Sequence, residues 1–106
     1  MKDRTVLYRM YSAMGTLLYV GVSNRVEFRI CCEHLVDKHW FKEVERITLE
    51  HFECRYVAEQ EEIRVIQREV PLFNVAHNLM PYGKNCHAWQ MFEAELERKR
   101  EAELTD

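Results

Sequence analysis

Residues 5–29, TVLYRMYSAMGTLLYVGVSNRVEFR, contain two short apolar runs joined by a polar segment. The runs, residues 6–11 and 17–22, are rich in valine and tyrosine, which favour β-strands. Gly15 lies in the segment between them, where a tight turn needs a residue with a permissive backbone. The stretch therefore predicts a β-hairpin.

A helix is expected directly after the hairpin. Ser23 and Asn24 are both residues that favour the N-cap position of a helix. We expect the helix to run from about Arg25 to His34, with Arg29 on its second turn.

Three side chains of this unit are expected to converge. Tyr8 and Tyr19 lie on neighbouring strands, at positions that share one face of the sheet, and Arg29 returns over that face on the helix. Two phenols and a guanidinium would form a site that binds an anion and handles protons. The alternative is that the tyrosines are half-buried sheet residues and the arginine reaches solvent.

The same stretch resembles the core of the GIY-YIG nuclease superfamily. VLYRMY stands in place of the first family motif, LYVGV in place of the second, and Arg29 follows Tyr19 at the spacing of the family's helix arginine. The chain is especially similar to the nuclease domains of bacterial excision-repair incision proteins and to small stand-alone members. The resemblance extends to Asn78. Val6 departs from the pattern, because the first motif usually has glycine there.

A third strand is predicted over residues 43–52. Ile47 and Leu49 alternate with polar residues, so one face of this strand is expected to be wet. Val44 and Phe52 fall on the opposite parity, which suggests a bulge or a distorted end.

The next segment, Cys54 to Glu69, has the periodicity of a helix that Pro71 terminates. Glu62 adjoins its apolar stripe, and a carboxylate there needs a partner. Arg64 or Arg68 could supply it, and so could a metal ion. The resemblance implies the metal, because a helix glutamate of the family binds one Mg²⁺ or Mn²⁺.

Glu62, Pro71 and Asn74 match the family's spacing of glutamate, proline and asparagine. The resemblance implies that Asn74 holds backbone near the site, although an ordinary turn asparagine would look the same. A family histidine often follows the helix arginine after four residues, whereas His34 follows Arg29 after five. We keep His34 as the counterpart, with His39 as a substitute.

Together these elements predict an α+β fold, with a three-stranded antiparallel sheet flanked by helices and an additional C-terminal helix. Residues 1–78 would form the nuclease-like core, and residues 79–106 a turn followed by an amphipathic helix from Cys86 to about Leu104. The apolar stripe of this helix is expected to pack on its own domain, with the last turns exposed. A homodimer or a protein partner is the alternative use of that stripe, which consists of Trp89, Phe92 and Leu96.

The chain has 106 residues, enough for one domain, and a net charge of −3. Six acids against three bases from residue 93 onward account for that charge, which leaves twelve of each in the rest. DNA contact would therefore depend on local cations and be weak and salt-sensitive. The candidates are Arg9, Arg25, Lys38 and Lys42.

The sequence shows no signal peptide and no apolar run of membrane-spanning length, so a cytoplasmic protein with reduced cysteines is expected. Structural zinc is a further alternative. The pairs that could supply ligands are Cys31 with His34, His51 with Cys54, and Cys86 with His87, but none has two-cysteine knuckle spacing.

The resemblance implies a divalent-metal-dependent DNA endonuclease that leaves a 5′-phosphate and a 3′-hydroxyl. Arg29 would neutralise the phosphate, Glu62 would bind Mg²⁺ or Mn²⁺, and Tyr19, with Tyr8 as its partner, would take the proton from water. The alternatives are a degenerate DNA-binding module, a nuclease subunit that needs a partner protein, and a small adaptor that binds only protein.

Overall fold

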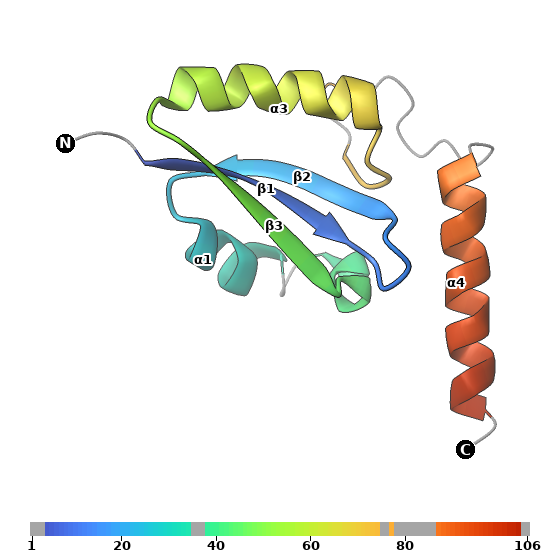
Figure 1. Ribbon diagram of the computed structural model, residues 1–106. Helices are drawn as coiled ribbons and strands as arrows, with labels where there is room; N and C mark the ends of the chain where they lie inside the picture. The colour runs from blue at the N-terminus through green and yellow to red at the C-terminus, as the bar shows by residue number, and fades with distance from the viewer. Residues whose placement is uncertain (1–3, 35–37, 75–76, 78–86, 105–106) are drawn as a thin grey trace.

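The computed structural model describes residues 4–34, 38–74, 77 and 87–104, with only the backbone described for residues 32–34. Its centre is one antiparallel sheet in the order β2-β1-β3 (Figure 1). The strands are β1 (Thr5–Tyr11), β2 (Leu17–Ser23) and β3 (Arg46–Phe52). The predicted hairpin and the predicted α+β fold are confirmed.

In the described part of the chain, three helical segments are short and two helices are long. α1 (Val26–Phe28) continues into a π-helix, η1 (Arg29–His34), and a 3-10 helix, η2 (His39–Glu43), precedes β3. The long helices are α3 (Arg55–Glu69) and the C-terminal α4 (His87–Leu104). Among the described residues, no helix combines the length and the apolar composition that crossing a membrane requires.

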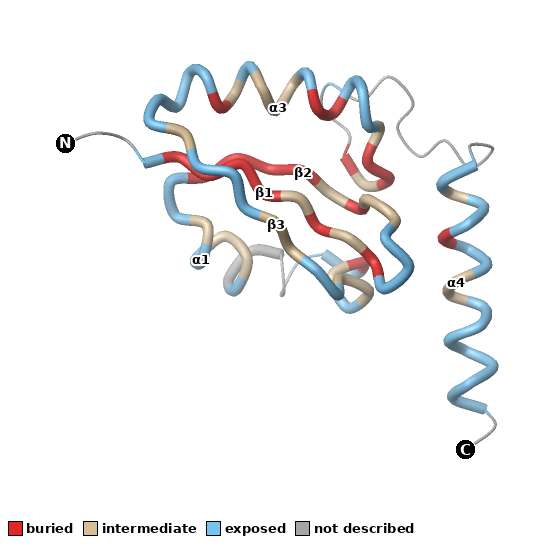
Figure 2. Tube along the Cα trace, viewed as in Figure 1, coloured by how far each residue is buried: buried red, intermediate tan, exposed pale blue. Residues whose placement is uncertain are grey.

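Both faces of the sheet are covered (Figures 1 and 2). On the α3 side the core consists of Leu7, Val20 and Val22 from the sheet with Ala58, Val65 and Ile66 from the helix. On the opposite side it consists of Tyr8, Met10 and Trp40, with residues of α1, η1 and η2 packed around them. Because side chains alternate along a strand, the central β1 contributes to both cores.

The third strand begins later than the sequence suggested, at Arg46 rather than residue 43. The chain first forms the 3-10 helix His39–Glu43, so Val44 lies outside the strand. The face to which Val44 was assigned is therefore irrelevant to the side-chain alternation of β3. The register between β1 and β3 is unbroken, so the bulge expected in this strand is absent. The irregularity lies instead between β1 and β2, at Met10 and Tyr11.

The C-terminal helix packs on the turn end of the hairpin, as expected. Phe92 is buried in a cluster with Leu18 and Leu72, and Trp89 and Leu96 pack against its margin. The Glu95 carboxylate accepts a hydrogen bond of 2.7 Å from the backbone N–H of Met14. The last turns of α4 are exposed (Figure 2), so the apolar stripe is largely used within the chain.

Candidate active site

The outer edge of β2 is where the predicted residues meet. The side-chain amide of Asn74 both accepts from the Val20 N–H and donates to the Val20 carbonyl, each at 2.9 Å. One step along the same edge, Arg29 Nη1 donates to the carbonyl of Val22 at 3.2 Å. Two segments far apart in the chain thus cover the free backbone groups of an edge strand, which otherwise invite pairing with another strand.

Tyr8 lies behind this edge and is fully buried. It is paired in register with Gly21 of β2, and its ring lies across that glycine. Tyr19 is half-buried on the same face, with 6.2 Å between the two ring centroids. The two tyrosines therefore share a face as predicted, but Tyr19 is the one that remains open to solvent.

Trp40 holds Tyr19 in place. The two rings stack at 23° with centroids 5.2 Å apart, and Trp40 also stacks on Phe73, at 5.6 Å. Trp40 is itself a core residue, only 5% exposed. Its contact with a candidate catalytic tyrosine was not predicted, because η2 and β2 are brought together only by the folded chain.

The helix carrying Arg29 differs from the predicted α-helix. After three α-helical residues the chain widens into the π-helix Arg29–His34, in which hydrogen bonds run from residue i to i+5. The backbone of His34 therefore follows that of Arg29 by one π-turn, as a residue four positions later would in an α-helix. This winding accommodates the five-residue gap. The side chain of His34 lies outside the described part of the structure.

Glu62 lies on the stripe of α3 that faces the sheet, one turn from the buried Ala58 and one turn from the buried Ile66. Burial raises the pKa of its carboxyl above the ordinary value, while the charges of His77 and Arg29 oppose this rise. Its local environment thus disfavours an isolated negative charge and favours one that meets a cation.

The arginines considered as partners for Glu62 are engaged elsewhere. Arg64 forms an ion pair of 2.9 Å with Glu61, and Arg68 lies 3.7 Å from Glu69. Of the cations in the predicted site, Arg29 is the one whose charge lowers the pKa of Glu62. Arg29 is carried by η1 and binds the β2 edge at the Val22 carbonyl.

His77 is a neighbour of Glu62 that the sequence did not single out. Among the charges that lower the pKa of Glu62, that of His77 has the largest effect. The His77 backbone has a φ of 63°, which is uncommon for a residue other than glycine. His77 lies three residues after Asn74, and this closeness to a predicted site residue was the only feature of the sequence that could have pointed to it.

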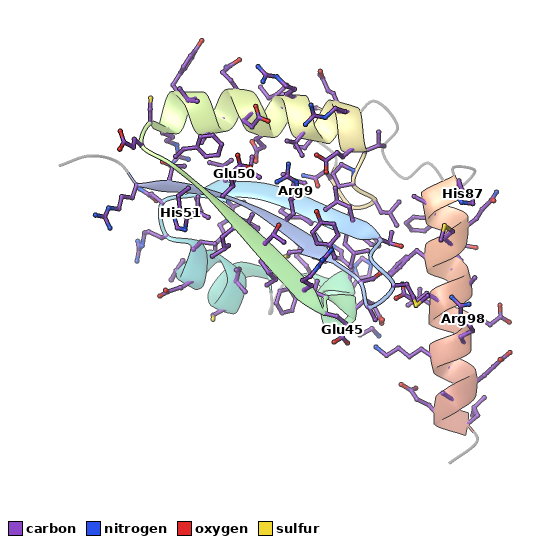
Figure 3. The ribbon with its side chains drawn as sticks, viewed as in Figure 1. Arg9, Glu45, Glu50, His51, His87 and Arg98 are labelled. Atoms are coloured by element: carbon purple, nitrogen blue, oxygen red, sulfur yellow. The ribbon has the colours of Figure 1, made fainter. Side chains whose placement is uncertain are left out.

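The candidate DNA-contacting cations have different surroundings. Arg9 lies between α3 and the sheet, where it forms ion pairs with Glu50 and Glu69 at 3.4 and 3.2 Å (Figure 3). We therefore assign Arg9 to the fold rather than to an interface. Lys38 and Lys42 are exposed, and Arg25 is exposed with its guanidinium 4.8 Å from the ring centroid of Phe28.

A single divalent ion fits the donor set at Glu62. Mg²⁺ characteristically uses one or two protein carboxylates and completes its shell with water and substrate phosphate, so one half-buried glutamate suffices. Structural zinc would need more ligands. In the part of the chain that the structure describes, no three or more His, Cys, Asp or Glu side chains group to hold a metal, but Cys86 lies outside that part.

Five of the predicted residues thus surround one strand, β2: Tyr8 and Tyr19 lie on one face of the sheet, Glu62 lies on α3 over the other face, and Arg29 and Asn74 bind the edge. In comparisons with known proteins, no family model matches this chain, and no curated protein or solved structure matches it either. The function of this chain is therefore inferred from the chemistry of these side chains and from the motifs that carry them.

Proposed function

We propose that this chain is a divalent-metal-dependent endonuclease that hydrolyses DNA phosphodiester bonds through a GIY-YIG-type site. The observation that carries the proposal is the arrangement around β2 of a phenol on one face of the sheet, a half-buried carboxylate over the other face and a guanidinium at the edge between them. The motif resemblance supports the same assignment. Such a set has a cation for the phosphate, a group that exchanges protons, and a ligand for a metal.

Arg29 is the phosphate-binding group. Its Nη1 is held by the Val22 carbonyl, so the guanidinium is oriented before substrate arrives. A guanidinium presents several N–H donors in a fixed plane, which suits the oxygens of a phosphate. Its charge stabilises the negative charge that accumulates when the phosphorus is attacked.

Tyr19 is the group that receives the proton of the attacking water. Tyr8 is fully buried, whereas Tyr19 is partly exposed and oriented by Trp40, so Tyr19 alone of the pair meets solvent. A free phenol has a pKa of about 10, so neighbouring positive charge must favour its ionised form. Tyr8 positions Tyr19 through their ring contact.

Glu62 would hold one Mg²⁺ or Mn²⁺, and His77 lies near enough to influence its charge. The bound ion would supply Lewis-acid stabilisation of the scissile phosphate and of the leaving oxygen. Asn74 keeps the β2 backbone in place beside these groups. The products expected from this family of reactions carry a 5′-phosphate and a 3′-hydroxyl.

Val6, which stands in place of the motif glycine, does not argue against cleavage. It is 7% exposed and paired with Ser23 and His51 inside the sheet, so its side chain does not project into solvent beside the site. We also place the protein in the cytoplasm, in keeping with the free thiols of Cys31 and Cys54.

The test is cleavage of supercoiled plasmid and of a branched DNA at low salt, with Mg²⁺, with Mn²⁺ and with EDTA. Cleavage that requires metal and that Arg29→Ala abolishes is the expected result. Binding of DNA in EDTA without cleavage in any metal would instead favour a degenerate binding module. Cleavage only after a second protein is added would favour a subunit of a larger nuclease.

A further inference from the structure

A pocket of about 490 Å³ lies between η2, Phe73 and α4. Its volume falls within the range of small-molecule sites. Both tryptophans of the chain, Trp40 and Trp89, contribute to its lining, although they come from segments nearly fifty residues apart. Tyr19 does not line the pocket, but Trp40, on which the Tyr19 ring stacks, and Phe73, on which Trp40 stacks, both do.

Much of the lining is aromatic, from His39, Trp40, Phe73, Trp89 and Phe92. Phe73 meets the ring of His39 edge-on, with centroids 5.9 Å apart, and that of Trp89 at 63° and 5.6 Å. Trp40 stacks behind Phe73 and is buried, whereas His39 is exposed and Trp89 is half-buried. The imidazole and the indole therefore offer ring surface to a planar guest, and a nucleobase is such a guest.

Charged residues stand around the aromatic lining: three cations, Lys42, Lys99 and Arg100, and two glutamates, Glu43 and Glu103. Lys42 from η2 and Arg100 from α4 are exposed and line opposite sides of the pocket. Lys99 is also there, in an ion pair of 3.1 Å with Glu43 that ties α4 to η2. Aromatic rings flanked by exposed cations are the combination with which proteins hold single-stranded nucleic acid, because each base stacks while its phosphate is neutralised.

We propose that this pocket binds one unpaired nucleotide of the DNA substrate, with its base against His39 and Trp89 and its phosphates beside Lys42 and Arg100. The stacked rings of Tyr19, Trp40 and Phe73 connect the pocket to the candidate catalytic tyrosine. The inference rests on the proposed function and refines it: the preferred substrate has a single-stranded segment next to the bond that is cut.

The two tryptophans make the pocket directly observable. We would titrate the full chain in EDTA, where no cleavage is expected, with an oligothymidylate of about ten nucleotides, a length within known single-strand sites. Intrinsic tryptophan fluorescence is the readout. Quenching that saturates is expected with this oligonucleotide, and a blunt duplex of equal length should bind at least about tenfold more weakly.

Two arginines on α4 provide a matched comparison. Arg100 lines the pocket, whereas Arg98, two residues away on α4 (Figure 3), lines a different hollow. Met14 and Glu95 line that hollow as well. Arg100→Ala is expected to weaken binding at least about threefold and His39→Ala at least about fivefold. Arg98→Ala should change it by less than about twofold, although it removes the same charge. Thermal unfolding of each variant would show that α4 is still in place.

No quenching by the single strand, or equal weakening by Arg98→Ala and Arg100→Ala, would overturn the proposal. The outcome is independent of catalysis. A chain that cuts DNA in Mg²⁺ but shows no quenching would keep the proposed function and lose the pocket. A chain whose quenching follows the pattern above but that cuts nothing would keep the pocket and lose the nuclease.

Discussion

The ring of Tyr8 occupies the space above Gly21 that a side chain would otherwise fill. The two residues are paired in register on β1 and β2, and a Cβ on Gly21 would lie less than 3.0 Å from the hydroxyl and ring carbons of Tyr8. The glycine in the second motif is thus explained by the tyrosine in the first. Tyr8 in turn contacts Tyr19, so this one glycine affects both candidate catalytic phenols.

Gly21→Ala is expected to force Tyr8 out of its position, because a fully buried ring has no free space to move into. Overpacking of this kind costs about 1–3 kcal/mol of unfolding free energy. Urea denaturation would measure it. In a Tyr8→Ala background the same substitution should cost nearly nothing, since the clash has gone. An equal cost in both backgrounds would show that Gly21 matters for another reason.

Asn74→Ala removes both side-chain hydrogen bonds to Val20 at the edge of the sheet. The unfolding free energy is expected to fall by about 1–3 kcal/mol, because backbone groups lose their partners at a buried position. Asn74→Asp keeps the acceptor but loses the donor, so it should be destabilising as well. If Asn74→Ala were as stable as the unmodified chain, the two hydrogen bonds of Asn74 would not stabilise the sheet edge.

The half-buried carboxyl of Glu62 predicts a specific dependence of stability on pH. Its pKa is raised in the folded chain, mainly by burial, so the folded state holds this proton more tightly than the unfolded state. The contribution is favourable at low pH and is lost as the pH rises through the raised pKa. In metal-free buffer, Glu62→Gln should therefore be more stable than the unmodified chain at neutral pH, and this advantage should shrink as the solution is acidified.

Thermal melts at several pH values in EDTA would measure this difference. Addition of Mg²⁺ should stabilise the unmodified chain and leave Glu62→Gln unchanged, since only the carboxylate holds the ion. Glu61→Gln is a suitable control because Glu61 forms an ion pair with Arg64. An advantage for Glu62→Gln that is independent of pH would show that its charge is not the cause.

The π-helix at Arg29–His34 predicts that one residue can be removed there. Deletion of the exposed Cys31 would bring Arg29 and His34 to four-residue spacing and allow ordinary α-helical hydrogen bonds. Because the two positions would still be one turn apart, cleavage should be retained within about tenfold. Cys31→Ser, which keeps the length, is the control. Loss of cleavage on deletion alone would show that the π-helix itself is required.

The sequence predicted the hairpin and both long helices, because strand alternation, helical periodicity and Pro71 are local signals. The choice of Arg29 and Asn74, which the structure places at the β2 edge, came from the motif resemblance instead. It did not predict the π-helix, whose extra residue is a matter of hydrogen-bond register rather than composition. The start of β3 was set too early, at residue 43, which instead ends the 3-10 helix η2.

Long-range relationships were the least predictable part of the site. The stacking of Trp40 on Tyr19 and the influence of His77 on Glu62 join segments that only the tertiary fold brings together. Arg9 was considered for DNA contact because of its charge alone, whereas strand parity places it under α3 beside Glu50 and Glu69. Charge in a sequence does not reveal whether another side chain already neutralises it.

The most direct test of the account compares two neighbouring glutamates on α3. Glu61 forms an ion pair with Arg64, whereas Glu62 faces the sheet and Arg29, so Glu61→Gln and Glu62→Gln make the same chemical change in different surroundings. The measurement is the single-turnover rate of DNA cleavage in Mg²⁺. We expect Glu61→Gln to stay within about threefold of the unmodified chain and Glu62→Gln to fall about a thousandfold, or about 4 kcal/mol of transition-state stabilisation. Equal rates for the two variants would contradict the central claim that Glu62 holds the catalytic metal.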